Sequence, residues 1–525
     1  MGITTATKPM ELLDANGNEM INRNHVLHDS LIAVPEISNN IGEFYRDAKI
    51  FMTGGTGFVG KVLLEKLLRS CDLIDSIYLL VRSKRGMAID QRLKELFKSP
   101  LFNKIKDKDE NLLNKVKVVE GDVSLPNLGL SQADITDLEM NVNIVFHSAA
   151  TVRFNENLRD AVVLNTMGTQ RVMELCTRMT NLKSVVHVST AYSNADKKEI
   201  DEIVYKPPFD PYSIINCVEN LPQEALDLLA EKLLNKHPNT YTFTKAMAEY
   251  LVMDYSAQLP VCIVRPSIVT GAWREPIPGW VDNVSGVTGI MMEIGRGSIK
   301  SIIANESLTM DLIPVDIVAN SLLTAAWHTV ANRSNVMRVY NCTSGNINSI
   351  LWKDFGTLTT KFALEYPTKY LSWYPGFSYR TNRVMHWICA ALFQTIPACI
   401  FDIILYCTKH KPIMYTISKK FERACKAGEF CSLNEWDFKV ENLRQLHSDV
   451  NRAEDGENFN VDMSKENGFT WEKYTHDFML GIRQYVLKDD LSSLPHAKTK
   501  LNRFYWANRA IQLISMYALL KLSIL

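Results

Sequence analysis

The sequence predicts an α/β fold, in which a doubly wound parallel sheet is followed by a mainly helical C-terminal region. Between residues 48 and 345, short runs rich in Val and Ile alternate with helical stretches, the pattern of βαβ units. After about residue 350, the composition shifts to Trp, Tyr and long apolar helical stretches. A chain of 525 residues also exceeds the roughly 250–300 residues at which single cores stop growing, so we expect several folded regions.

Composition and charge exclude several classes of function. Lys plus Arg and Asp plus Glu both number 58, so no net charge attracts nucleic acid. The ten cysteines lie far apart without a CxxC pair. This argues against a zinc site or a disulfide framework and for reduced thiols facing a cytosol. Residues 1–20 contain no apolar core long enough for a secretory signal. We expect no metal centre.

Six segments are expected to form the strands of the sheet. Each is short and rich in Val and Ile, as buried parallel strands are. In chain order they are Lys49–Thr53, Ile77–Arg82, Val116–Glu120, Ile144–His147, Ser184–Ser189 and Val261–Arg265.

A glycine-rich turn follows the first strand. It reads GxxGxxG and leads into a helix whose apolar residues recur at helical spacing. In a Rossmann unit, the first glycine makes the tight turn and the second lets the backbone approach a pyrophosphate, while the third lets the helix lie close to the sheet. A merely flexible turn would leave the flanking strand and helix unexplained. We predict that the residues contacting a dinucleotide here are Thr53, Gly54, Gly57, Phe58, Val59 and Gly60.

The end of the second strand indicates which dinucleotide binds. NAD sites usually carry an acid about 20 residues after the glycine turn, where it holds the ribose 2′-hydroxyl. This chain has Arg82 there, with Lys84 and Arg85 close behind. Because cations suit a 2′-phosphate, NADPH is favoured over NADH; the alternative is a solvated basic loop.

Two further strand ends are expected to line the cofactor. The third strand is followed by Asp122 and Val123, whose side chain and backbone N–H, respectively, are placed to meet the adenine. The fourth is followed by Ser148, Ala149 and Ala150, which are small enough to leave room for the cofactor.

The motif YTFTK, residues 241–245, contains two residues that we expect to be catalytic. Tyr241 and Lys245 are four residues apart and share one face of a helix, so the ammonium is expected to lower the phenol pKa from about 10. Tyr241 then becomes a proton donor when hydride reaches a carbonyl, and both residues are expected to contact the cofactor. A second hydrogen bond to the carbonyl oxygen would come from the end of the fifth strand. We prefer Thr190 for it, with Ser189 as the alternative.

On these motifs, residues 44–345 resemble the extended short-chain dehydrogenase/reductase superfamily, in which Ser/Thr, Tyr and Lys are catalytic. Within this superfamily, the chain is similar to the insect-type fatty acyl-CoA reductases. The stretches that support this resemblance are FYRDAKIFMTGGTGFVGKVLLEKLL, HSAATVRF, RPSIVTGAWREPIPGWVDN and DLIPVDIV. Downstream, PACIFDIILYCTKHKPIMYTISKKFERA, WDFKVENLRQL and WEKYTHDFMLGIRQYVLKDD resemble that family's C-terminal sterile domain. Gln394 departs from the pattern, since such proteins usually carry His there.

The resemblance implies NADPH-dependent reduction of a long-chain fatty acyl-CoA to a primary alcohol through a fatty aldehyde, with release of CoA. The residues themselves indicate a carbonyl reductase site but no thioester. Arg153, Arg265 and Arg274 could contact CoA phosphates or pair with local acids. The alternatives are a sterol or nucleotide-sugar enzyme of the same superfamily and a non-catalytic NADP-binding scaffold.

We therefore expect four parts along the chain. A lead-in over 1–47 precedes an NADP-binding reductase domain with substrate-binding insertions over 48–345. A helical sterile domain follows over 346–490, and an apolar membrane-associated tail over 491–525.

Two apolar segments indicate a membrane-associated enzyme. Residues 384–407 are about long enough to span ~30 Å of hydrocarbon, but His386, Gln394 and Asp402 lie inside them, so a buried or partly inserted amphipathic segment is an equal alternative to a span. Residues 504–525 place aromatic side chains before an apolar stretch that is short for a span. We expect the catalytic domain to face the cytosol, at the endoplasmic reticulum membrane, with peroxisome and lipid droplet as alternatives.

Overall fold

The computed structural model describes residues 12–13, 19–20, 39–83, 88–332 and 336–524. These residues form two compact units, each assembled from three stretches of chain. Each unit includes residues from both sides of position 345, where the sequence suggested a boundary. The sheet unit comprises Met1–Pro266, Asn320–Cys342 and Lys439–Asn460, and the helical unit comprises Ser267–Ala319, Thr343–Phe438 and Val461–Leu525.

Among the described residues, the sheet unit contains a parallel sheet of seven strands in the order β13-β9-β7-β6-β3-β4-β5. The chain runs outward from β3 to β4 and β5, then returns to β6 and continues the other way. This confirms the doubly wound fold, whose ligands bind beyond the carboxyl ends of the strands where the order reverses. The strands are β3 (Lys49–Thr53), β4 (Ser76–Val81), β5 (Val116–Glu120), β6 (Ile144–His147), β7 (Ser184–Val188), β9 (Val261–Pro266) and β13 (Val339–Cys342).

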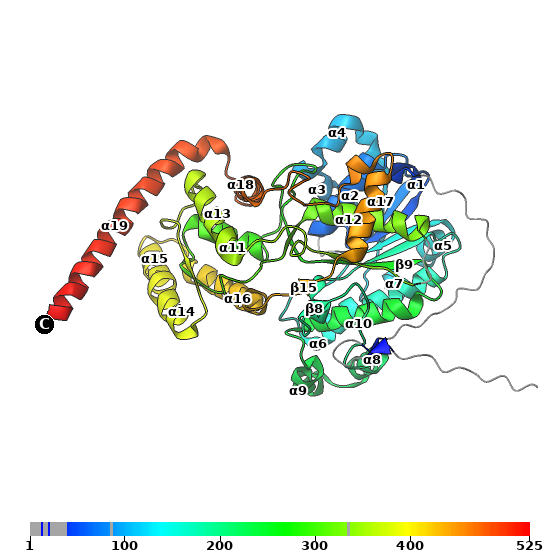
Figure 1. Cartoon of the computed structure of the whole chain (residues 1–525), viewed down its shortest axis with the longest axis horizontal. Coiled ribbons are helices and arrows are strands. Elements are labelled where there is room, and N and C mark those ends of the chain that lie inside the picture. Colours follow the sequence, from blue (N-terminus) through cyan, green and yellow to red (C-terminus); the bar gives the residue numbers. More distant parts are fainter. Residues whose placement is uncertain (1–11, 14–18, 21–38, 84–87, 333–335, 525) are drawn as a thin grey trace, which may run out of the picture. The chain divides into compact units, whose positions relative to one another are not determined.

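Both faces of the sheet are covered by helices, so its central strands are buried over their whole length. Figure 1 shows α2, α12 and α17 on one face and α5, α7 and α10 on the other. The helices of this unit are α1 (Ile41–Phe44), α2 (Phe58–Ser70), α3 (Ile89–Phe97), α4 (Asn103–Asp109), α5 (Gln132–Asn141), α6 (Leu158–Ala161), α7 (Gly168–Thr177), α8 (Pro211–Asn220), α9 (Gln223–Leu234), α10 (Thr240–Tyr255), α12 (Val315–Ala331, in this unit from Asn320) and α17 (Glu441–Arg452).

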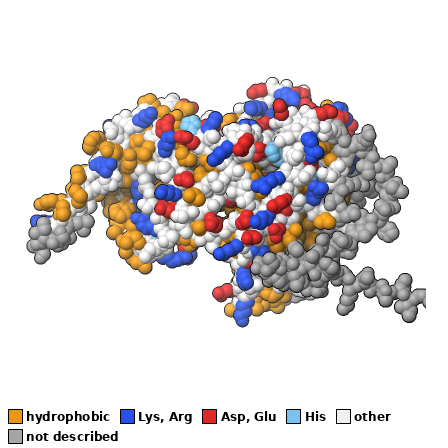
Figure 2. All heavy atoms as spheres, viewed as in Figure 1, with side chains coloured by type: hydrophobic (Ala, Val, Ile, Leu, Met, Phe, Trp, Pro, Cys, Tyr) orange, Lys and Arg blue, Asp and Glu red, His pale blue; other side chains and the backbone are white. Residues whose placement is uncertain are grey.

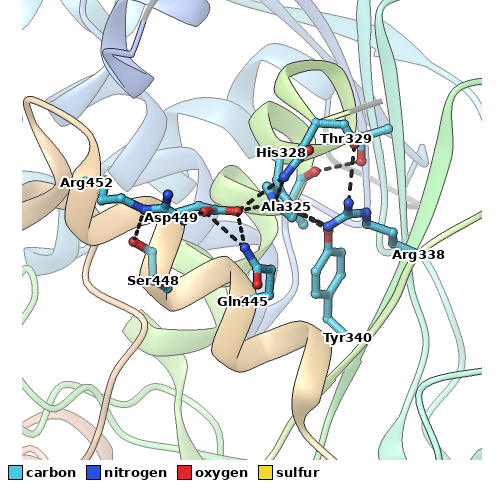
Figure 3. Close-up of polar contacts among 10 residues, drawn as sticks. Ala325, His328, Thr329, Arg338, Tyr340, Gln445, Ser448, Asp449 and Arg452 are labelled. Carbon is cyan, nitrogen blue, oxygen red and sulfur yellow. Dashed lines mark hydrogen bonds and ion pairs between the residues drawn. The ribbon is translucent and has the colours of Figure 1, made fainter. Parts of the chain in front are cut away.

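Helix α17 is held to the sheet unit by a polar cluster (Figure 3). The Oδ2 atom of Asp449 lies 2.8 Å from His328 Nε2, and His328 Nδ1 lies 2.7 Å from the hydroxyl of Tyr340 on β13. Burial lowers the pKa of His328, which favours the neutral ring. With its proton on Nε2, that ring donates to Asp449 and accepts from Tyr340, so both contacts are satisfied.

The helical unit contains a second, smaller set of elements. Two short parallel pairs, β10 with β12 and β11 with β14, accompany its helices. Their bounds are β10 (Ile268–Thr270), β11 (Ser301–Ile303), β12 (Leu312–Pro314), β14 (Ser378–Arg380), α11 (Val287–Arg296), α13 (Trp352–Glu365), α14 (Arg383–Ala390), α15 (Ile396–Cys407), α16 (Met414–Leu433), α18 (Trp471–Gly481) and α19 (Leu494–Ile524).

One helix of this unit is long and apolar enough to cross a membrane, as judged over the described residues. It covers Arg383–Cys407, in which a π-helical segment (Ala391–Thr395) joins α14 to α15, and hardly any of it is buried. Figure 2 shows hydrophobic side chains gathered over this helix and along α19. A contiguous exposed apolar surface is typical of a site that contacts a membrane, a ligand or another protein.

The polar residues inside that apolar helix have partners within the helical unit. Asp402 accepts hydrogen bonds from the backbone N–H groups of Ile413, Met414 and Tyr415, at 2.8, 2.8 and 2.9 Å, and so caps the start of α16. Similarly, Gln394 Oε1 accepts from the Lys300 N–H at 3.1 Å. The polar groups that interrupt the apolar pattern therefore fix the helix to its own unit.

Candidate active site

The glycine turn adopts a conformation that two of its glycines make possible. Gly54 has a φ of +74°, and a Cβ there would meet the backbone of Ser148 and Ala149 at 2.7 Å. At Gly60, a Cβ would lie 2.3 Å from the Gly54 carbonyl oxygen. At Gly57, by contrast, a Cβ would meet only that oxygen, at 3.1 Å. The middle glycine thus leaves bare backbone at the start of α2, where the helix dipole favours a phosphate.

A buried hydrogen-bond network joins this turn to the end of β6. The hydroxyl oxygen of Thr53 accepts the backbone N–H groups of Ser148 and Ala149, both at 3.2 Å, and lies 2.8 Å from His147 Nδ1. Because its oxygen already accepts twice, Thr53 donates its proton to His147. The other ring nitrogen lies 3.0 Å from the hydroxyl of Thr169, and burial lowers the pKa of His147 to about 3, so the ring is neutral.

Next to this turn, the residues predicted to select the cofactor lie at the ends of β4 and β5. Arg82 is exposed, and its Nη1 lies 3.7 Å from Asp122 Oδ2. The other oxygen of Asp122 accepts the Ser124 N–H at 2.9 Å, while Val123 is buried. Lys84 lies outside the described residues. The structure therefore brings Arg82 and Asp122 together at the same edge of the sheet.

Tyr241 and Lys245 lie one turn apart on α10, as predicted. The Lys245 ammonium donates to the Val188 carbonyl at the end of β7, at 2.7 Å. Burial lowers the pKa of Lys245 to about 8, and the carboxylate of Glu249 opposes this shift. The Phe154 ring stacks on Tyr241, with their centroids 5.8 Å apart.

The expected depression of the Tyr241 pKa is wrong for this structure. Burial raises it to about 12, against an opposing hydrogen bond from Thr190. The physical reason is that the surrounding protein shields the Tyr241 phenol from water, while the Lys245 ammonium is directed to a backbone carbonyl. The Tyr241 hydroxyl is therefore protonated near neutral pH, as a proton donor must be.

The two candidates at the end of β7 differ in their partners. Ser189 donates its hydroxyl proton to Glu249 Oε1 at 2.5 Å. Thr190 instead caps the short helix Ala191–Asn194, accepting from the Tyr192 N–H at 3.4 Å, and its hydroxyl is the one that bonds Tyr241. This geometry favours Thr190 over Ser189 as the second donor to a substrate oxygen.

A buried ion pair beneath this site decides between the two roles that the sequence left open for Arg265. Arg265 is fully buried, and its Nε and Nη2 atoms donate to the two carboxylate oxygens of Glu249 at 2.8 and 2.7 Å. Its other N–H groups donate to the carbonyls of Asp201 and Ile203 and to the side chain of Asn341. Since every N–H of the guanidinium is used, Arg265 is a structural partner of Glu249 rather than a phosphate ligand.

The other two arginines are placed differently. Arg153 is exposed, with its Nη1 3.5 Å from Glu156. Arg274 lies over the Trp273 ring at 3.8 Å and donates to the Asn467 carbonyl. Only Arg153, of these three, belongs to the sheet unit and presents its guanidinium to solvent.

Asn165 is a further residue that sequence reasoning missed. It lies on the π-helical segment Val162–Met167, where its Oδ1 accepts the Thr151 N–H at 2.8 Å. Its Nδ2 donates to the Thr151 carbonyl and to the Thr244 hydroxyl, at 3.1 and 3.0 Å. Asn165 thus connects the segment after β6 to α10; the only sequence signal was an amide within an otherwise apolar helical stretch.

Family comparisons identify relatives of this chain. Two family models match it, both described as male sterility protein: an NAD-binding model over residues 52–322 and a sterile model over 393–489. Fatty acyl-CoA reductase 1 of Rattus norvegicus and of Homo sapiens are each 38% identical over 464 residues, covering 88% of this chain and 89% of the relative. Fatty acyl-CoA reductase 2 of Bos taurus is 36% identical over 479 residues, covering 90% of this chain and 92% of the relative.

Solved structures show the same fold. The terminal R domain from the myxalamid PKS-NRPS biosynthetic pathway superposes with a TM-score of 0.57 at 20% identity, covering 88% of this chain and 96% of that one. The reductase domain of a nonribosomal peptide synthetase from Mycobacterium tuberculosis superposes with a TM-score of 0.55 at 17% identity, covering 87% of this chain and 94% of that one. At these identities the likeness concerns the fold alone.

Proposed function

Because the chain belongs to the fatty acyl-CoA reductase family, we propose that it reduces long-chain fatty acyl-CoA to the primary fatty alcohol at the site on α10. The observation that carries this assignment is the group formed by Thr190, Tyr241 and Lys245 at the carboxyl edge of the sheet, beside the glycine turn. The family match over the C-terminal region supports an acyl-CoA substrate over a sterol or a nucleotide sugar. On the four stretches quoted above for the reductase domain, from FYRDAKIFMTGGTGFVGKVLLEKLL to DLIPVDIV, we place the chain in the insect-type group.

The glycine turn fits a dinucleotide, because Gly57 leaves backbone accessible at the start of α2. We take the cofactor to be NADPH, with Arg82 and Lys84 facing its 2′-phosphate and Asp122 and Val123 beside the adenine. Ser148, Ala149 and Ala150 would line the site together with the glycine turn. Bound NADPH supplies the hydride.

In the first reduction, the hydroxyls of Tyr241 and Thr190 donate hydrogen bonds to the thioester carbonyl oxygen as it gains negative charge. The tetrahedral adduct then breaks its C–S bond, leaving a fatty aldehyde and CoA thiolate, which takes up a proton. In the second reduction, Tyr241 gives its proton to the oxygen of the aldehyde as the alcohol forms. Lys245, when charged, stabilises the phenolate that Tyr241 becomes.

Both reductions share one site in this proposal. The chain contains a single GxxGxxG turn. Tyr415 and Lys419, a further Tyr-Lys pair at the helical spacing, lie on α16 of the helical unit and have no glycine turn of their own, so we assign both reductions to Tyr241 and Lys245. The fatty aldehyde is therefore an intermediate that the same Tyr241 and Thr190 must accept.

We place the enzyme at a membrane, through the exposed apolar helix Arg383–Cys407. The sheet unit would face the cytosol, which agrees with the ten cysteines being unpaired thiols. The endoplasmic reticulum membrane is our assignment, with peroxisome and lipid droplet as alternatives.

Turnover by the purified full-length chain tests the function directly. The protein, held in phosphatidylcholine nanodiscs, would be given palmitoyl-CoA and NADPH, and lipid products and free CoA thiol would be quantified. We expect hexadecanol and CoA in equal amounts, with two NADPH oxidised for each. If neither NADPH oxidation nor thiol release exceeds that of a Lys245→Met variant, the proposal is overturned.

A further inference from the structure

The helical unit contains a cavity of 1580 Å³ that is open to the outside. Pockets that hold drug-sized ligands are smaller, roughly 300–1,000 Å³. Its walls come from the end of α11 and the segment after it, residues 372–378, the apolar helix Arg383–Cys407, α16 and α19. Most of the side chains that line it are apolar or aromatic, among them Trp373, Phe377, Trp387, Phe401, Phe421 and Ile511.

Among the described residues that line the cavity there are two lysines: the Lys300 ammonium is partly buried, and Lys426 is exposed. The Nζ of Lys300 donates to the carbonyls of Tyr374 and Gly376, at 2.6 and 3.4 Å. Burial lowers the pKa of Lys300 to about 8, and no acidic group is among the causes of its shift. Below pH 8 the cavity therefore presents a cation that backbone carbonyls hold in place.

The acids of the cavity wall are paired with other cations. Within the part of the chain that the structure describes, none of them contacts Lys300. The pairs are Glu293 with Arg296 at 2.7 Å, Glu429 with Arg383 at 2.7 Å, and Glu422 with Lys419 at 2.6 Å.

One wall of the cavity is formed by the apolar helix Arg383–Cys407, whose opposite side is exposed. Ile400, Phe401 and Ile404 line the cavity and are 52%, 49% and 52% exposed, whereas Ile403 and Tyr406 do not line it and are 62% and 74% exposed. One helix thus has a cavity on one side and, if the protein lies at a membrane, lipid on the other.

From this juxtaposition we propose that the cavity binds the hydrocarbon chain of an anionic single-chain lipid, with the head group beside Lys300. The apolar walls match the chain, and an ammonium without a carboxylate partner matches a negative head. A free fatty acid and a lysophosphatidate share this chemistry, as carboxylate and phosphate respectively. The site contains none of the residues assigned to catalysis and does not rest on the proposed function.

Photolabelling of the full-length chain tests the site. The protein in phosphatidylcholine nanodiscs would be irradiated with a diazirine-bearing palmitic acid, and labelled residues would be located by mass spectrometry. We expect labels on cavity-lining residues, competed to saturation by palmitate or by palmitoyl lysophosphatidate; the stronger competitor identifies the head group. Labelling that neither competes, or that falls equally on Ile403 and Tyr406, overturns the proposal.

Two matched pairs of variants make the test specific. Ala398 lines the cavity and the adjacent Cys399 does not, so Ala398→Trp should lower labelling at least five-fold and Cys399→Trp should leave it unchanged. Lys300→Met should weaken competition by the anionic lipid about ten-fold while leaving competition by hexadecanol unchanged. The control for that charge is Lys420→Met, an exposed lysine of α16 outside the cavity.

Equal effects within either pair contradict the assignment. Palmitoyl-CoA turnover, measured on the same samples, separates this outcome from failure of the proposed function. A sample that reduces palmitoyl-CoA but shows no competed labelling overturns the lipid site alone.

Discussion

Tyr241, Lys245 and Glu249 lie on successive turns of α10, so a phenol, an ammonium and a carboxylate share one face of that helix. The Glu249 carboxylate also accepts hydrogen bonds from the Ser189 hydroxyl and the Arg265 guanidinium. These bonds fix the end of β7 next to Lys245. Burial lowers the pKa of Lys245 and Glu249 raises it. The charge state of Lys245 near pH 8 therefore depends on Glu249.

This arrangement predicts the pH dependence of the reaction. Lys245 is charged below its pKa of about 8 and loses its proton as the pH rises through that value, so kcat/KM should fall on the alkaline side. Glu249→Gln removes the anion that raises this pKa, so the alkaline limb should move to lower pH. The comparison needs pH profiles of both proteins with palmitoyl-CoA. An unchanged limb in the variant would show that Lys245 does not control it.

Cofactor choice is predicted to depend on Arg82. Arg82→Asp places an anion where the 2′-phosphate is expected, so kcat/KM for NADPH should fall at least ten-fold while that for NADH changes little. Lys94→Asp, an exposed cation on the neighbouring helix α3, is the matched charge control. Equal losses for the two cofactors in Arg82→Asp would remove Arg82 from the cofactor site.

Residue patterns indicated the candidate site residues whose arrangement is set by short-range spacing. Glycines at a turn and Tyr-Lys at helical spacing are visible in short windows of sequence. The sequence did not predict roles for His147, Asn165 and Glu249, because those roles depend on partners far along the chain. Glu249, for example, bonds Ser189, which is 60 residues away, and the direction of the Tyr241 pKa shift depends on burial that no short window contains.

At the scale of elements, the six predicted strands agree with the structure to within one residue at each end. Strand β13 was not predicted, because VYNC is short and lacks the run of Val and Ile that marks the others. The return of α17 to the sheet unit was not predictable either. It depends on contacts such as that between His328 and Asp449, which are 121 residues apart.

The attachment of α17 can be tested through Asp449. Asp449→Ala leaves the buried Nε2–H of His328 without its carboxylate acceptor, which should destabilise the contact by about 1–3 kcal/mol. Hydrogen exchange of the α17 amides should then be roughly 5- to 150-fold faster. Ser448→Ala is the control, because Ser448 is exposed and contributes only its backbone carbonyl to the cluster. Unchanged exchange in Asp449→Ala would mean that other contacts hold the helix.

For the whole molecule, two surfaces are suited to a membrane. The helix Arg383–Cys407 is one, and α19 is the other, with Trp506, Ile514 and Tyr517 each at least 66% exposed. Composition predicted both segments. Sequence could not show that Asp402, inside the first, serves as the cap of α16, because the capped residues follow 11 to 13 positions later.

Deletion of residues 504–525 should therefore shift a sizeable fraction of the protein from the membrane pellet to the soluble fraction. The fraction that stays would be held by Arg383–Cys407. Sedimentation after expression of the full-length and truncated chains measures this, with palmitoyl-CoA turnover as the control for folding. If the truncated chain stays wholly in the pellet, α19 is not an anchor.

The claim that one site performs both reductions is tested most directly with Tyr241→Phe, assayed separately on palmitoyl-CoA and on hexadecanal. Removing the shared proton donor should lower both activities by about 10²–10⁴-fold. Tyr250→Phe, on the same helix, should leave both unchanged, and NADPH binding should be retained in both variants. Loss of thioester reduction with hexadecanal reduction near the wild-type rate would contradict the account, because the two steps would then use different acids.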